Sequence, residues 1–390
     1  MKQIPYYSPN FGIIDFFLSL FISNAKEKCT EYYKELTGKE YILITSSCRS
    51  ALYLAYKAIS KQGKVISSPL ICKTALEPII ESNNKIEFVD ISLETFNMDL
   101  NLLPDDPTSD TIAIQATYLG GRPLDMDNLL KYKNKHKLIL IEDCAQGFGS
   151  KYKHINLGSF GDIACFSMIK TAYGISGGIL ATNDKNIYTK AKLLQDNFKT
   201  GSKFLNTYRV VRNILETYRM NSIGNRAYNK LLNLRPQKSE EQYFSSQLVK
   251  PWDFSIKLFA YNIARFKKLH SKRLQNADNI ISTLNNNYKS NYINNNKYQM
   301  LPTKLFFSKD NFDAKNDIEK INKLGAEAKH LQQKYQSYYQ NSMNMKIWSA
   351  IDSSKLKNYK SLHDKIFSLP LYENMRKTTI TKINSILDNE

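Results

Sequence analysis

The chain has 390 residues, 42% of them hydrophobic, and a formal net charge of +19 at pH 7. This length allows one large domain and one smaller domain with a sizeable core. The apolar run 13–22 is too short to span a bilayer, is interrupted by Asp15 and lacks signal-peptide flanks. The five cysteines are odd in number and widely spaced, which favours reduced thiols and a cytoplasmic protein without a metal or iron–sulfur site.

A basic charge of this size is compatible with nucleic acid, an anionic membrane or phosphorylated small molecules as partners. Much of the excess is lysine scattered among asparagines, as in residues 285–290 and 294–297. The chain also carries no helix-turn-helix, zinc-finger or RNP signature. We therefore expect a solvated basic surface and no nucleic-acid partner.

Short β-rich runs alternate with helical patterns from residue 41 to about residue 183, which predicts a mostly parallel α/β sheet wrapped by helices. Apolar residues at helical spacing predict helices over 50–60, 74–82 and 127–136. Nine of the fifteen glycines lie between Gly120 and Gly178, where close approach of the backbone to a ligand is expected. The predicted strands are 41–45, 64–67, 85–91, 111–117, 137–143, 163–167 and 178–182.

After residue 183 the pattern becomes helical, first over 185–197 and then through the basic segment 199–235, which has eight basic residues and one acidic residue, Glu216. An amphipathic basic segment could lie weakly on an anionic membrane surface or cover the active site or a dimer partner, and we favour the cover. A polar linker over 236–242 and a long helix over 252–284 are expected next. The runs 301–308, 317–334 and 378–387 then predict a small α+β domain. We accordingly divide the chain into a large domain, 1–250, and a small domain, 251–390.

Two charged residues suggest pyridoxal phosphate chemistry. Asp143 ends a buried strand, and Lys170 follows 27 residues later in a turn that contains Gly174, Gly177 and Gly178. This cofactor needs a lysine to form a Schiff base and an anion to keep its pyridine nitrogen protonated. An aspartate that caps a turn and an exposed turn lysine are the simpler interpretations.

The segment 44–55 places small polar residues between a strand and a helix. Such a turn offers backbone N–H groups and a helix dipole to a phosphate, and Arg49 would add a positive charge. Serine at such a turn is equally explained as a helix cap.

Five motifs occur in an order that identifies a family: residues 46–52, 88–99, 118–127, 141–146 and 158–167. They resemble the DegT/DnrJ/StrS sugar aminotransferases over about residues 41–184, and a weaker likeness continues to 368–372. The resemblance implies a fold type I pyridoxal-phosphate enzyme that moves an amino group from an amino acid, such as glutamate, to a keto group of a nucleotide-linked sugar. It also implies a homodimer with active sites at the subunit interface, acting in the biosynthesis of bacterial surface polysaccharide or another glycan.

By position in the family's motifs, Lys170 resembles the lysine that binds the cofactor, Asp143 the partner of the pyridine nitrogen and Gln146 the residue near the ring hydroxyl. The expected phosphate contacts come from Ser167, Ser47, Cys48 and Arg49, and Cys72 occupies the position of a ring-stacking aromatic.

Three departures from the family keep other interpretations open. Cys48-Arg49 replaces a Gly-Thr pair, Cys72 replaces the aromatic residue, and the lysine motif is two residues shorter and lacks a histidine. A pyridoxal-phosphate sugar dehydratase is one alternative, although such relatives lack the lysine or need a cysteine cluster. A catalytically reduced scaffold that binds a sugar nucleotide is the other.

Overall fold

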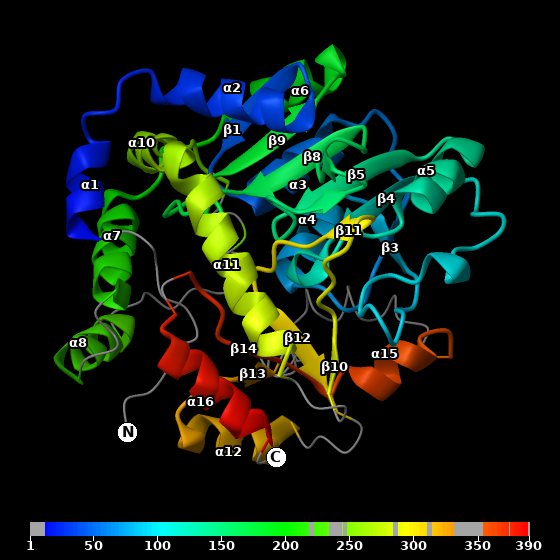
Figure 1. The fold of residues 1–390 in the computed structure, drawn as a ribbon. Coiled ribbons are helices and arrows are strands. Elements are labelled where there is room, and N and C mark those ends of the chain that lie inside the picture. The colour runs from blue at the N-terminus through cyan, green and yellow to red at the C-terminus, as the bar shows by residue number, and fades with distance from the viewer. Residues whose placement is uncertain are drawn as a thin grey trace.

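The computed structural model describes residues 12–217, 222–233, 244, 248–283, 288–309, 314–330, 354–373 and 375–388. Its largest sheet has seven strands in the order β1-β9-β8-β5-β4-β2-β3 (Figure 1). Strand β9 is antiparallel to both of its neighbours, and the other four pairings are parallel. The predicted mostly parallel sheet is confirmed. Its strands are β1 (Tyr41–Thr45), β2 (Lys64–Ser67), β3 (Lys85–Phe88), β4 (Thr111–Thr117), β5 (Ile139–Cys144), β8 (Ile163–Ser167) and β9 (Gly178–Thr182).

The strands of this sheet are apolar because helices cover both faces. All residues of β4, β8 and β9 are buried. Strand β3 is shorter than predicted, since the chain turns after Phe88 and Asp90 accepts a hydrogen bond from the Ile91 backbone at 2.8 Å. Strand β5 starts two residues later than predicted, after Lys137 adopts a left-handed φ of 54°.

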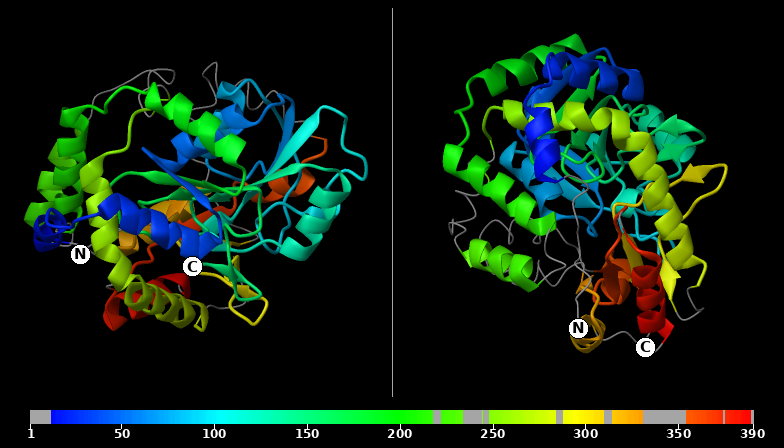
Figure 2. Two further views of the ribbon diagram at one scale, coloured as in Figure 1. Left: turned by 90° about the horizontal axis from the view of Figure 1, so that it is seen from above. Right: turned by 60° about the vertical axis from the view of Figure 1, so that its left-hand side comes forward.

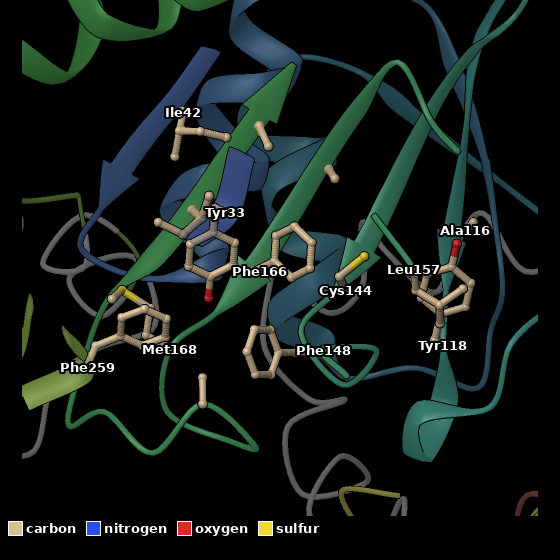
Figure 3. Packing of buried hydrophobic residues seen from close by; sticks show 14 of the residues in the cluster. Tyr33, Ile42, Ala116, Tyr118, Cys144, Phe148, Leu157, Phe166, Met168 and Phe259 are labelled. Carbon is tan, nitrogen blue, oxygen red and sulfur yellow. The ribbon is translucent and has the colours of Figure 1, made fainter. Parts of the chain in front are cut away.

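Helices form a layer on each side of the sheet. Helices α3 (Cys48–Ala58), α4 (Lys73–Glu81) and α6 (Lys185–Asp196) contribute to the core on one face. The other face packs against α2 (Ala25–Thr37) and α5 (Met126–Lys135), with α10 (Asp253–Asn262) and α11 (Phe266–Ile281) beside them. Figure 3 shows the aromatic part of this second core, where the rings of Tyr33 and Phe166 lie 5.1 Å apart. Helices 50–60, 74–82, 127–136 and 185–197 are thus confirmed to within about two residues.

The single long helix predicted over 252–284 is wrong. The chain forms α10 (Asp253–Asn262), a 3₁₀ turn η3 (Ile263–Arg265) and α11 (Phe266–Ile281). At the break, the side chain of the buried Asn262 donates to the Tyr173 carbonyl at 3.1 Å. No proline or glycine lies in this stretch, so the sequence carries no ordinary signal for a break. Helix α11 continues from the large sheet to a second sheet (Figure 1).

The second sheet has four antiparallel strands in the order β10-β12-β14-β13. These strands are β10 (Lys289–Ser290), β12 (Leu305–Ser308), β13 (Lys329–His330) and β14 (Ile366–Leu369), and they lie with α12 (Ala314–Leu324), α15 (Lys357–Leu362) and α16 (Lys377–Asp388). The runs 301–308, 317–334 and 378–387, which together predict an α+β arrangement, contain β12, most of α12 with β13, and most of α16; residues 331–334 lie outside the described residues. The division into two domains at residue 250 stays a prediction.

The remaining elements are short or peripheral. Helices α1 (Ile13–Ser19), α7 (Lys203–Thr217) and α8 (Ser222–Asn233) lie on one flank of the molecule (Figures 1 and 2). The predicted linker 236–242 lies outside the described residues. A small sheet joins β6 (Lys151–Tyr152), β7 (Ile155–Asn156) and β11 (Tyr298–Gln299), and 3₁₀ turns η1 (Leu100–Leu102) and η2 (Leu119–Gly121) complete the set.

Candidate active site

The predicted site residues gather at one edge of the seven-stranded sheet, where the parallel strands end. Asp143 is the penultimate residue of β5, Ser167 ends β8, and Thr117 ends β4. Lys170 follows three residues after β8, in the loop that returns to β9 at Gly178. The carboxyl edge of a parallel sheet is the usual ligand-binding edge of α/β proteins.

Asp143 is a buried carboxylate with few partners. Its Oδ1 accepts a hydrogen bond from the Ala145 backbone at 3.0 Å, and the Cys48 thiol lies 3.7 Å from the same oxygen. Burial raises the pKa of Asp143, while the positive charge of Lys170 and the Ala145, Cys48 and Thr117 hydrogen bonds oppose that rise. The site therefore favours an additional positive charge close to this carboxylate.

Lys170 is half-buried at the tip of a compact loop. The loop closes on itself, because Gly174 donates its N–H to the Met168 carbonyl at 2.5 Å and Met168 donates to Gly177 at 3.0 Å. Burial lowers the pKa of Lys170, and the opposing attractions come from Cys72, Asp143 and Cys48. These three predicted residues are therefore close to the amine, and a lowered pKa makes that amine a better nucleophile near neutral pH.

The turn at 46–48 packs directly against the end of the loop 168–177, which joins β8 to β9 and which we call the lysine loop. Gly177 donates its N–H to the Ser46 carbonyl at 2.9 Å, and Ser47 bridges Gly177 as a parallel pair. A Cβ on Gly178 would lie 2.3 Å from the Ser47 carbonyl carbon. Ser47 caps α3, since its Oγ accepts from the Ser50 N–H at 3.1 Å. The capping interpretation of this serine is thus observed, and its phosphate contact stays a prediction.

Arg49 points into the protein toward α4. Its Nε lies 3.4 Å from Glu77 Oε2, and both side chains are buried. Lys73, one turn earlier on α4, places its Nζ 3.5 Å from the other oxygen of Glu77. The charge expected to face a phosphate is therefore paired with a carboxylate in the interior, and a direct phosphate contact from Arg49 stays a prediction.

The other three predicted residues occupy distinct places around the site. Gln146 Oε1 accepts hydrogen bonds from the Gly120 N–H at 3.1 Å and from Thr303 Oγ1 at 3.0 Å. Ser167 Oγ accepts from the Ile169 N–H at 3.4 Å, at the start of the lysine loop. Cys72 is the N-cap position of α4, and its sulfur accepts from Thr74 Oγ1 at 3.0 Å. Their cofactor contacts stay predictions.

Two residues beside the site come from the segment before β12 and were not predicted. Thr303 binds Gln146 through its hydroxyl and Gly120 through its backbone, with a Thr303 N to Gly120 O distance of 2.8 Å. Lys304 is close enough to Lys170 for its positive charge to contribute to the lowered pKa of that amine. This segment lies more than 130 residues after Lys170, so no local motif could have assigned it.

Known proteins are similar in sequence to about half of the chain. The chain is 34% identical over 203 residues to GDP-perosamine synthase of Escherichia coli O157:H7, covering 49% of this chain and 56% of that protein. It is 34% identical over 175 residues to the spore coat polysaccharide biosynthesis protein SpsC of Bacillus subtilis, covering 43% of this chain and 45% of that protein. The chain thus spans about half the length of these curated relatives.

Solved structures share the fold over almost the whole chain. Helicobacter pylori PseC, an aminotransferase involved in the biosynthesis of pseudaminic acid, superposes with a TM-score of 0.77 at 18% identity and covers 100% of this chain and 99% of its own. The E. coli GDP-4-keto-6-deoxy-D-mannose-3-dehydratase with bound hydrated pyridoxal phosphate gives 0.76 at 18% identity, with 99% and 100% covered. These likenesses confirm the predicted fold type I architecture.

The family model for DegT/DnrJ/EryC1/StrS aminotransferases matches residues 24–227, which is more than half of the chain and contains Asp143, Lys170 and the turn at Ser47. The chain belongs to the DegT/DnrJ/EryC1/StrS aminotransferase family, as its motifs predicted.

Proposed function

We propose that the protein is a pyridoxal-phosphate-dependent aminotransferase that moves an amino group from an amino acid, with glutamate as the donor, to a keto group of a nucleotide-linked sugar in bacterial surface polysaccharide or glycan biosynthesis. The observation that carries the proposal is the placement of Lys170 close to the buried Asp143 at the carboxyl edge of the sheet. The relatives named as perosamine synthase and as polysaccharide biosynthesis protein support the choice of substrate class.

The residues present fit pyridoxal phosphate. A buried carboxylate whose pKa is raised by burial suits a protonated ring nitrogen, and an amine whose pKa is lowered suits an aldehyde. The turn at 46–48 opens α3 with backbone N–H groups at the same edge, where a phosphate would be favoured. When bound, the cofactor would supply an electron sink for the carbon that loses its proton.

Each residue then has a definite task. Lys170 would hold the cofactor through Nζ and, once released, would move a proton from the α-carbon of the amino donor. Asp143 would keep the ring nitrogen protonated by charge pairing in a site from which water is excluded. Gln146 would orient the ring from the side of Thr303, and Ser167, Ser47, Cys48 and Arg49 would surround the phosphate, with Cys72 against the ring.

Replacement of the lysine tests the proposal directly. Lys170→Ala should abolish the visible absorbance of the loaded protein and reduce the transamination rate by several orders of magnitude. Borohydride treatment of the wild-type protein, followed by peptide mapping, should leave the cofactor-derived adduct on Lys170. An adduct on another residue, or an active yellow Lys170→Ala protein, would contradict the assignment.

A sugar dehydratase is the second candidate, because dehydratase structures superpose on the chain as well as aminotransferase structures do. The presence of Lys170 favours transamination. Incubation with glutamate and keto sugars distinguishes the two, since transamination forms 2-oxoglutarate in proportion to the amino sugar. Purified protein that takes up no pyridoxal phosphate would instead favour a reduced sugar-nucleotide-binding scaffold.

The proposed assembly is a homodimer with active sites at the interface. Helix α1 and the residues after it expose Ile13, Ile14, Phe17 and Phe21 to between 58 and 70%, and Phe204 of α7 is 61% exposed. Large exposed apolar side chains on one flank are typical of a subunit interface. Sedimentation equilibrium should give twice the chain mass, and a monomer that transaminates at full rate would refute the assembly.

Weak membrane-surface association through 199–235 is a further proposal, for a protein that we place in the cytoplasm. Within the described ranges, no helix has the length and apolarity to cross a membrane. Tyr208 of α7 is buried, and Val210 and Ile214 pack on the core, so part of its apolar face is already in use. Flotation with anionic liposomes, comparing the wild type with a deletion of 199–235, should show binding lost in the deletion. Absence of binding in the wild type would end the membrane proposal.

A further inference from the structure

A cluster of three buried side chains links the lysine loop to the C-terminal part of the chain. Glu373 lies four residues after β14, and its carboxylate accepts hydrogen bonds from the Tyr173 hydroxyl and from Arg273 Nε. All three side chains are almost completely buried. We call Tyr173, Arg273 and Glu373 the Glu373 clamp.

Tyr173 is the member of the clamp that belongs to the lysine loop, three residues after Lys170. Its φ is +55°, a left-handed conformation that an aromatic residue rarely keeps unless its surroundings hold it. Hydrogen bonds hold Tyr173 at both its backbone and its side chain. Asn262 donates to the Tyr173 carbonyl at 3.1 Å, and Glu373 accepts from the hydroxyl.

Helix α11 holds the same loop at a second point. Burial lowers the pKa of His270 to about 4, so the ring is neutral near pH 7. Its Nε2 lies 3.1 Å from the Thr171 carbonyl, and because a carbonyl only accepts, this nitrogen carries the hydrogen. The backbone that follows Lys170 is therefore fixed by side chains of α10 and α11.

Arg273 extends the clamp to the segment that borders the proposed active site. Besides Glu373, it donates through Nη1 to the Pro302 carbonyl at 3.3 Å and to the Thr303 carbonyl at 3.1 Å. Thr303 in turn binds Gln146. One guanidinium thus ties the segment after β14, the segment before β12 and, through Glu373, the lysine loop.

We propose that Glu373, Arg273 and Tyr173 are positioning residues that set where the amine of Lys170 lies. Their hydrogen bonds couple the lysine loop to the positions of segments 302–303 and 372–373. The proposal rests on the proposed function of Lys170. Asn276 supports the coupling, since it donates to the Tyr372 carbonyl at 2.8 Å and so fixes the residue before Glu373 to α11.

Removal of the Tyr173 hydroxyl tests whether the clamp does more than pack in the core. Tyr173→Phe removes its hydrogen bond to Glu373 and leaves the Arg273–Glu373 ion pair intact. Tyr118→Phe is a matched control, because Tyr118 is also fully buried and donates to a buried carboxylate, Glu142, at 2.6 Å. Both variants lose one oxygen atom and the hydrogen bond from that hydroxyl to a buried carboxylate.

The readout is the reactivity of Lys170 in the full chain after removal of any bound cofactor. Trace acetylation with acetic anhydride across a pH series, followed by peptide mapping, reports the neutral fraction of this amine. We expect Tyr173→Phe to let the loop relax and the amine gain solvent, so that the acetylation of Lys170 at neutral pH, relative to its plateau at high pH, falls by about threefold or more, since one pKa unit changes the neutral fraction about tenfold. Tyr118→Phe should leave it unchanged.

Unchanged acetylation in Tyr173→Phe, or equal changes in both variants, would overturn the proposal. If Tyr173→Phe does not fold, Glu373→Gln with Glu142→Gln as its control gives the same comparison. A wild-type chain that binds no pyridoxal phosphate would remove the proposed function but would leave the acetylation result valid, so the two failures are distinguishable.

Discussion

Adding one methyl group at Gly178 should push the turn at 46–48 away from the end of the lysine loop. These are two parts of the proposed cofactor site that meet at this glycine. An ideal Cβ there lies 2.3 Å from the Ser47 carbonyl carbon, 2.4 Å from the Cys48 nitrogen and 2.5 Å from the Ser47 oxygen. Non-bonded carbon atoms in contact are about 3.5–4.0 Å apart, so in Gly178→Ala the neighbouring backbone must move by about 1 Å or more. Gly178 pairs with Thr45 and Ser167 on its two sides, so the turn at 46–48 is the part that must move.

The expected cost follows from that displacement. A misplacement of about 1 Å in an active site can cost about 100-fold in rate, and overpacking costs about 1–3 kcal/mol of stability. Because the displaced turn would offer its N–H groups to the phosphate in the wrong place, spectroscopic titration with pyridoxal phosphate should also show weaker binding in Gly178→Ala. Gly201→Ala is the control, because a Cβ there meets its nearest atom, Val249 Cγ2, at an ordinary 3.5 Å. Wild-type affinity in Gly178→Ala would refute the reasoning.

Three further substitutions test individual charges. Asp143→Asn should raise the free energy of unfolding of the cofactor-free protein at neutral pH: burial raises the pKa of Asp143, so the stability contributed by its protonated form is lost as pH rises through that pKa. Urea unfolding of both proteins should show the gain disappear in acid, and a gain that persists there would contradict the assignment. Glu142→Gln should destabilise by about 3 kcal/mol in thermal unfolding, because the carboxylate accepts from Tyr118 and three backbone N–H groups; a loss below 1 kcal/mol would argue against this network. Glu77→Leu should lower the free energy of unfolding by about 3–5 kcal/mol, because Arg49 stays buried beside Lys73 without this carboxylate. The double variant Arg49→Met with Glu77→Leu should recover much of that loss. Additive losses in the double variant would exclude the coupling.

The strands that surround the site were predictable because each is short, apolar and bounded by turn residues. β1, β2, β4, β8 and β9 have the bounds that the sequence predicts. The break between α10 and α11 was not predictable, because it coincides with a contact from Asn262 to Tyr173, 89 residues away along the chain.

The same limit applies to the site. Lys170, Asp143 and Gln146 lie in local motifs, and their convergence follows from parallel strands that end at one edge. The partner of Arg49 was not predictable from local sequence, because Glu77 lies on another helix. Glu77 pairs with the positive charge that the sequence analysis assigned to a phosphate. Lys304 reaches the site, and Arg273 and Glu373 reach the lysine loop, only through the folding of the C-terminal segments, for which the sequence offers no short-range pattern.

Neighbouring acids in β5 have opposite surroundings. Glu142 lies beside Leu140 and Cys144 on the face toward Tyr118, and Asp143 lies on the other face toward Cys48. Because side chains alternate along a strand, inserting one residue in β5 before Glu142 would turn both carboxylates to the opposite faces and put Glu142 at the position of Asp143. The acid that anchors three backbone amides would then occupy the chemical position, and its neighbour would enter the hydrocarbon interior. Length variation among relatives should therefore be confined to the loops on either side of this strand.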